Sequence, residues 1–148
     1  MVIYGLMVLI SFCMIMSLRM LFFTHKVQGK WVSFENFLFL TFIYATVMIG
    51  FGLIYILLEL DGSLVLMEGS KHIEELLGQP IVVKEDLVEE FFDKLETGLY
   101  FSAITLFSVG YGDIAPVGIG RIIAVIEALI GYTIPAAFVA RAVFDMEK

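Results

Sequence analysis

The chain has 148 residues, of which 60% are hydrophobic and 17% charged, with a mean hydropathy of +0.96 and a formal net charge of −7. An ordinary soluble domain is about half apolar and about a quarter charged, so this composition excludes one. It indicates a membrane protein, and the acidic balance gives no reason to expect a nucleic-acid partner.

The first predicted element is a membrane helix in residues 1–23. Residues 1–18 carry no charge, and about 17–25 apolar residues are needed to cross a bilayer. A cleaved secretory signal is the alternative, but no positive charge precedes the apolar run and no Ala-x-Ala site follows it. We therefore expect a retained helix that packs against the outside of the next one.

A linker (residues 24–34) and a second membrane helix (residues 35–60) follow. Lysine and arginine near the ends of spans favour the cytoplasmic side of a membrane. Five of the nine basic residues lie around the linker and after the last apolar run, namely Arg19, Lys26, Lys30, Arg141 and Lys148. We therefore expect the linker and the C-terminus in the cytoplasm and the N-terminus outside.

Residues 61–96 form an acidic segment that contains ten acidic residues and three lysines. Because it lies on the side opposite the basic linker, we expect it outside the cell. A short helix is predicted near residues 70–77 and a break at 78–80. Another helix opens near Glu85 and Asp86, where acidic residues favour a helix N-terminus.

Residues 97–116 contain the most informative motif, Thr-Leu-Phe-Ser-Val-Gly-Tyr-Gly-Asp at positions 105–113. The uncharged run before it is shorter than a full span. A half-length helix followed by an extended strand would enter and leave the membrane on one side, which requires cover by protein or water. Glycine allows left-handed backbone at little cost, so the motif could turn successive carbonyls toward one axis. An ordinary turn is the alternative for Gly-Tyr-Gly alone.

This motif resembles the selectivity filter of the tetrameric potassium channel family, in its single-pore form with an added N-terminal span. The resemblance is strongest over residues 97–141. It implies an all-α membrane protein with three transmembrane helices, a re-entrant pore helix and a filter loop, assembled as a homotetramer. It also implies a multi-pass protein of the plasma membrane, with no enzymatic activity and no cofactor besides permeant K⁺. The compact design suggests a prokaryotic source.

In this family, backbone oxygens of the filter replace the water around K⁺. The resemblance assigns that role to Ser108, Val109, Gly110, Tyr111 and Gly112, with the Ser108 hydroxyl at the inner end. Ser108 and Phe107 both stand where threonine is common in the family, so we expect a looser innermost site and a bulky ring behind the filter. The resemblance implies that Thr105 also lies behind the filter.

Two acidic residues flank the filter in the sequence. Asp113 stands where the family often has an aspartate at the outer rim, and we expect it to concentrate cations and brace the filter. The alternative interpretation is that Asp113 is an ordinary acidic residue in a solvent-exposed loop. Glu127 interrupts the last apolar run, where an ionisable group is by default functional and has a partner. It points either behind the filter, toward pore-helix amides or Tyr and Ser hydroxyls, or into the water-filled cavity.

The inner helix is predicted in residues 117–148, together with a short tail. Gly131 occupies the place where family members often have a hinge glycine. Pro135 has no N–H, so the carbonyl of Gly131 loses its helical partner. We expect a kink between these two residues. Beyond it, Val139 and Val143 share a face and could form a hydrophobic gate.

Three other functions compete with a potassium channel. A weakly selective monovalent cation channel is the nearest, although Tyr111 argues against the non-selective relatives that carry a carboxylate there. A non-conducting membrane subunit or scaffold with a filter-like loop belongs to a different class. Potassium transporters normally carry four such loops in one chain, and this chain has one. Membrane lipid, further copies of the chain and K⁺ are the expected partners.

Overall fold

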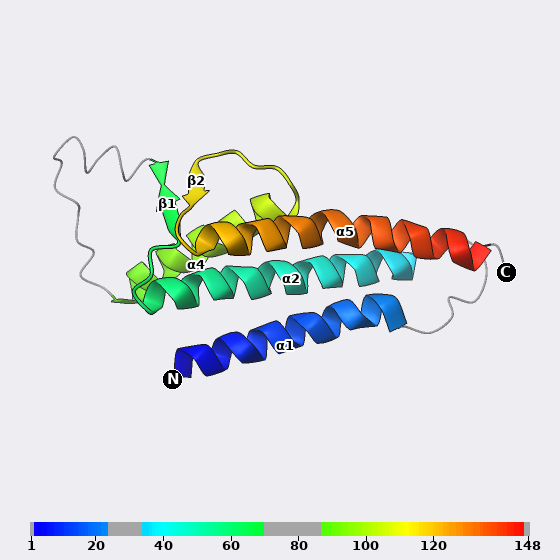
Figure 1. Cartoon of the computed structure of the whole chain (residues 1–148), viewed down its shortest axis with the longest axis horizontal. Helices are drawn as coiled ribbons and strands as arrows, with labels where there is room; N and C mark the ends of the chain where they lie inside the picture. The colour runs from blue at the N-terminus through cyan, green and yellow to red at the C-terminus, as the bar shows by residue number, and fades with distance from the viewer. Residues whose placement is uncertain (1, 24–33, 70–86, 147–148) are drawn as a thin grey trace.

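The computed structural model describes residues 2–23, 34–69 and 87–146, and the structural statements below concern these residues. In chain order the elements are α1 (Val2–Phe23), α2 (Phe34–Leu60), β1 (Leu66–Glu68), α4 (Leu87–Leu106), β2 (Ile114–Pro116) and α5 (Gly120–Met146) (Figure 1). Three helices of the described part are long and apolar enough to cross a membrane, at Val2–Arg19, Phe37–Leu60 and Gly120–Ala140. The prediction of a mostly helical, multi-pass membrane protein is confirmed.

Helix α2 is the centre of the arrangement. In Figure 1, α1, α2 and α5 lie alongside one another with α2 in the middle, and α4 packs against α2 and α5. The Met14 side chain of α1 lies over Gly50 of α2, since a Cβ there would come within 2.7 Å of Met14 Cγ. The first helix therefore packs on the second, as the sequence predicts. At its start, the Tyr4 hydroxyl donates to Asp61 Oδ2 at 2.9 Å.

Helix α4 continues across the predicted boundary at residue 97, because it runs without a break from Leu87 to Leu106. The helix that the sequence predicts to open near residues 85 and 86 and the predicted pore helix are therefore one helix. Thr97 marks a change from charged to apolar side chains, but no proline stands there to interrupt the helix. Gly98 lets α4 approach α2, since a Cβ there would lie 3.1 Å from the Gly52 carbonyl oxygen.

A small antiparallel sheet, which the sequence does not predict, joins the segment after α2 to the segment before α5. Leu66 pairs with Pro116 and Glu68 with Ile114. Beside the sheet, the Gly69 amide donates to the Asp113 carbonyl at 3.0 Å and the Val117 amide to the Val65 carbonyl at 2.8 Å. The chain that returns from the 107–113 loop is thereby held at the end of α2. The helix predicted near residues 70–77 lies outside the described residues.

Candidate functional site

The loop of residues 107–113 starts against the C-terminal end of α4. The amides of Val109 and Gly110 donate to the Ile104 carbonyl at 2.8 and 3.2 Å, and the Ser108 amide donates to the Thr105 carbonyl at 3.0 Å. Helix α4 ends at Leu106, so the negative end of its dipole lies beside the loop. Thr105 is thus part of the last turn that carries the loop.

The backbone of this loop alternates in handedness. Ser108, Gly110 and Gly112 have positive φ angles of 56°, 56° and 81°. Left-handed residues at every second position turn successive peptide carbonyls to one side of the strand. The sequence predicts such backbone at the glycines but not at Ser108, which is the one non-glycine residue of the described part with positive φ. That conformation costs about 1–3 kcal/mol and persists only where surrounding contacts impose it.

The side chains of the loop are open in a single chain. Tyr111 is 73% exposed, Val109 48% and Phe107 55%. The Phe107 ring nevertheless has a partner, because it stacks on Tyr44 of α2 with ring centroids 5.3 Å apart. The predicted placement of Phe107 behind the loop therefore has a specific contact, which the sequence could not name.

Asp113 ends the loop and is held by three contacts. The Tyr100 hydroxyl of α4 donates to Asp113 Oδ2 at 2.7 Å, and the Ile114 amide donates to Oδ1 at 3.1 Å. The Asp113 carbonyl accepts from Gly69. The hydrogen bond to this carboxylate raises the pKa of Tyr100 above its ordinary value, so the phenol keeps its proton and stays a donor. These contacts fit a bracing role for Asp113.

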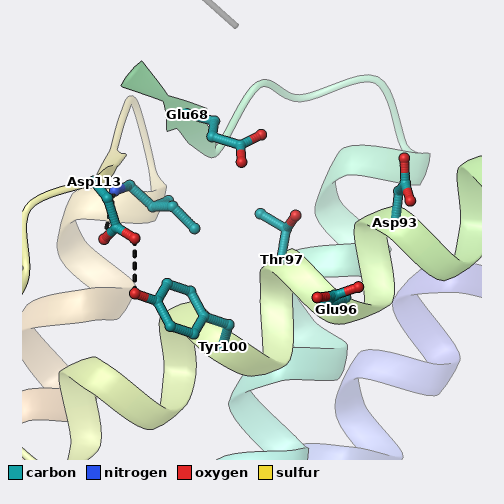
Figure 2. Close-up of a pocket in the computed structure, with 7 residues that line it drawn as sticks. Glu68, Asp93, Glu96, Thr97, Tyr100 and Asp113 are labelled. Carbon is teal, nitrogen blue, oxygen red and sulfur yellow. Dashed lines mark hydrogen bonds between the residues drawn. The ribbon is translucent and has the colours of Figure 1, made fainter. Parts of the chain in front are cut away.

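An acidic cavity of about 360 Å³ lies next to Asp113. Its lining residues are Glu68, Asp93, Glu96, Thr97, Tyr100, Asp113 and Ile114. Figure 2 shows carboxylates from β1, from α4 and from the end of the loop arranged around it. Acidic side chains gathered on one side create a negative potential that attracts cations. Among the described residues, no group of three or more His, Cys, Asp or Glu side chains is placed to hold a metal ion.

Glu127 is completely buried between α2, α4 and α5. The Tyr55 hydroxyl donates to its Oε2 at 2.8 Å, and the Ser102 hydroxyl contacts its Oε1. Ser102 also lies 2.8 Å from the Met48 carbonyl. Of the two placements that the sequence leaves open, the structure has Glu127 against Tyr and Ser hydroxyls. Tyr55 and Ser102 are functional candidates that sequence reasoning missed.

We expect Glu127→Gln to keep stability close to that of the wild type and Glu127→Leu to lower it by about 1–3 kcal/mol. The glutamine side chain can accept from the Tyr55 hydroxyl with its carbonyl and donate to the Ser102 oxygen with its amide. The Ser102 hydroxyl can still donate to the Met48 carbonyl. Leucine leaves the buried Tyr55 hydroxyl without an acceptor. Thermal unfolding of the purified protein checks the difference, and equal losses for both variants would contradict this account.

Gly131 and Pro135 lie in one turn of α5, which runs as a single helix from Gly120 to Met146. A Cβ on Gly131 would collide with the Leu106 carbonyl oxygen, so glycine allows α5 to touch the end of α4. The Gly131 carbonyl, which Pro135 leaves without a helical donor, accepts from the Tyr44 hydroxyl at 2.9 Å. Val139 is 60% exposed, and the side chain of Val143 lies outside the described residues. The hinge and the gate stay predictions.

The chain is similar to known proteins over a region that includes the 107–113 loop and helix α5. Residues 73–146 match the family model described as "Ion channel". Protein LctB of Bacillus caldotenax is 40% identical over 104 residues, covering 70% of this chain and 67% of that protein. Protein LctB of Geobacillus stearothermophilus is 41% identical over 105 residues, covering 71% of this chain and 68% of that protein. No solved structure gives a significant match.

Proposed function

Because this chain belongs to the ion channel family whose model it matches, we propose that it is a potassium-selective channel. It conducts K⁺ passively through a filter made of the carbonyls of Ser108, Val109, Gly110 and Tyr111. The observation that carries the proposal is the alternating backbone of residues 108–112, with positive φ at every second residue. Such a strand presents a ladder of oxygens that can replace the water around a K⁺ ion.

The proposal includes assembly as a homotetramer. One filter strand cannot encircle an ion, and a closed ring of identical copies is the simplest way to do so. The loop backbone and its Tyr111 side chain are exposed in a single chain. Irregular backbone at membrane depth must be covered by protein or line a water-filled space. Neighbouring copies satisfy that condition on one side of the strand, and the ion pathway satisfies it on the other.

Two electrostatic features support cation conduction. The C-terminal end of α4 lies beneath the loop, and each such helix end carries about half a negative charge, so four of them favour a cation in the central cavity. At the other end of the loop, Asp113 and the acidic cavity raise the local cation concentration. Cations are therefore favoured on both sides of the filter.

The same proposal fixes the orientation in the membrane. Tyr4 bonds to Asp61, so the N-terminus lies on the side of the acidic cavity, which we assign to the outside. The basic linker and the C-terminus then lie in the cytoplasm, in agreement with the distribution of Lys and Arg. Both relatives come from bacteria, which supports a prokaryotic plasma membrane.

Ion flux in liposomes tests the function. We expect the purified protein to release K⁺ from loaded vesicles, Ba²⁺ to block the release, and Na⁺-loaded vesicles to lose little of their content. Empty liposomes are the control. Equal Na⁺ and K⁺ fluxes would identify a weakly selective cation channel. A folded tetramer without any flux would identify a non-conducting subunit, and either result would overturn the proposal.

A further inference from the structure

Tyr44 joins three parts of the molecule. It lies on α2, its hydroxyl donates to the Gly131 carbonyl of α5 at 2.9 Å, and its ring stacks on Phe107 with centroids 5.3 Å apart and planes at 16°. Phe107 directly precedes Ser108, the first residue of the proposed filter. One side chain therefore touches both the inner helix and the base of the loop.

The carbonyl to which Tyr44 donates, that of Gly131, has no amide donor within helix α5. In an α-helix the carbonyl of residue 131 accepts from the amide of residue 135, which here is a proline without an N–H. An unsatisfied carbonyl in the membrane interior is costly, because lipid offers no donor. The Tyr44 hydroxyl stands in for the missing amide and fixes this turn of α5 to α2.

The same turn of α5 also lies directly against the end of α4. Gly131 contacts Leu106, since a Cβ on the glycine would lie 3.1 Å from the Leu106 Cα. Leu106, Phe107 and Ser108 are consecutive, and Ser108 is held with a positive φ of 56°. A bend or rotation of α5 at Gly131 therefore displaces the Tyr44 hydroxyl and the end of α4 together. Both displacements reach the base of the loop within two residues of Ser108.

We propose that Tyr44 is a positioning residue that couples the Pro135 turn of α5 to the inner end of the filter. The Tyr44 hydroxyl follows the Gly131 carbonyl, which Pro135 leaves without a helical donor, when that carbonyl moves. The Tyr44 ring then displaces the Phe107 ring on which it stacks. The inference rests on the proposed channel function, and it adds a physical link between the inner helix and the filter. The link runs through the outer helix α2 in addition to the direct contact between α4 and α5.

A double-mutant cycle tests this coupling. Tyr44→Phe removes the hydroxyl and keeps the ring, whereas Pro135→Ala returns an amide to the Gly131 carbonyl. We expect Tyr44→Phe alone to change the ratio of open to closed channels by roughly three- to tenfold, the effect of one hydrogen bond. In the Pro135→Ala background the same substitution should change the ratio less than twofold, because the carbonyl no longer depends on Tyr44. Single-channel recording in planar bilayers measures the ratio.

Tyr4→Phe is the matched control. This substitution also removes a tyrosine hydroxyl that bonds to another part of the chain, since Tyr4 donates to the Asp61 carboxylate at 2.9 Å. Tyr4, however, lies on α1 and away from the filter. We expect no change in the ratio of open to closed channels. A change as large as that of Tyr44→Phe would mean that any lost hydroxyl disturbs gating, and it would overturn the specific role of Tyr44.

Phe107→Leu tests the second half of the link. On the Phe107→Leu background, which lacks the ring stack, we expect Tyr44→Phe to lower the melting temperature, because the Gly131 carbonyl still loses its donor, but to leave the ratio of open to closed channels unchanged. A merely structural role for Tyr44 would alter the melting temperature alone in every background. Equal shifts of the open ratio on the wild-type and the Pro135→Ala backgrounds would overturn the coupling. A wild type that carries no K⁺ would instead overturn the proposed function.

Discussion

We expect Gly110→Ala to abolish the proposed potassium-selective flux and Gly62→Ala to leave it intact. Both glycines have positive φ angles, 56° at Gly110 and 88° at Gly62, and at neither would a Cβ lie within 4 Å of a described residue other than its chain neighbours. Both substitutions therefore impose a similar backbone strain, about 1–2 kcal/mol. At Gly110 the strain is relieved by rotating a peptide whose carbonyl belongs to the proposed ion path. At Gly62 it is relieved in a turn after α2.

Two measurements on both variants separate strain from function. Thermal unfolding should show a similar decrease in stability for Gly62→Ala and Gly110→Ala. Liposome flux should show the wild-type preference for K⁺ over Na⁺ in the first variant, and either no flux or equal fluxes in the second. If Gly110→Ala retained the wild-type preference, the carbonyls of the 108–112 strand would not be the selective element.

We expect Gly131→Ala to prevent assembly of a stable channel. An added Cβ would overlap the Leu106 carbonyl oxygen and lie 2.9 Å from the carbonyl carbon. These are backbone atoms at the end of α4, so they cannot move aside as a flexible side chain can. Overpacking of this kind costs about 1–3 kcal/mol or more. That loss exceeds the gain of about 1 kcal/mol that alanine has over glycine inside a helix.

Gly5→Ala is the matched control for Gly131→Ala. Gly5 is also inside a membrane helix, and a Cβ there would meet nothing within 4 Å, so only the gain in helix propensity remains. Size-exclusion chromatography and thermal unfolding should show wild-type or higher stability for Gly5→Ala and loss of the assembled form for Gly131→Ala. A stable Gly131→Ala protein with altered gating would favour the hinge interpretation of this glycine over close packing.

The membrane spans are predictable from composition because each depends on a contiguous run of residues. The three apolar runs agree with the three spanning helices, since bilayer thickness sets the length of apolar sequence that a helix needs. The resemblance to the channel family implies that Phe107 lies behind the loop, and the same place is one of the two that the sequence leaves open for Glu127. Their partners Tyr44, Tyr55 and Ser102 are not predictable, since those contacts depend on how α2 and α4 pack.

The continuity of α4 across residue 97 and the small sheet are features that local sequence patterns do not predict. Strands β1 and β2 have three residues each and no alternating pattern of their own, so only their pairing across the mouth of the loop makes them strands. In α4 the change of hydropathy near Thr97 predicts a boundary that the helix does not have. Side-chain polarity changes there because the helix leaves the protein interior, while the backbone continues without a break.

By itself the sequence determined the class of protein, the number of spans, the filter-like motif and the carbonyl that Pro135 leaves without its helical donor. Each of these depends on covalent structure or on neighbours within one turn. Only the tertiary structure decided what satisfies that carbonyl and what surrounds Glu127, because the donors Tyr44 and Tyr55 lie 87 and 72 residues away in the chain. Contacts at such separations exist only once the helices have packed, and the buried polar groups of a membrane protein must find their partners there.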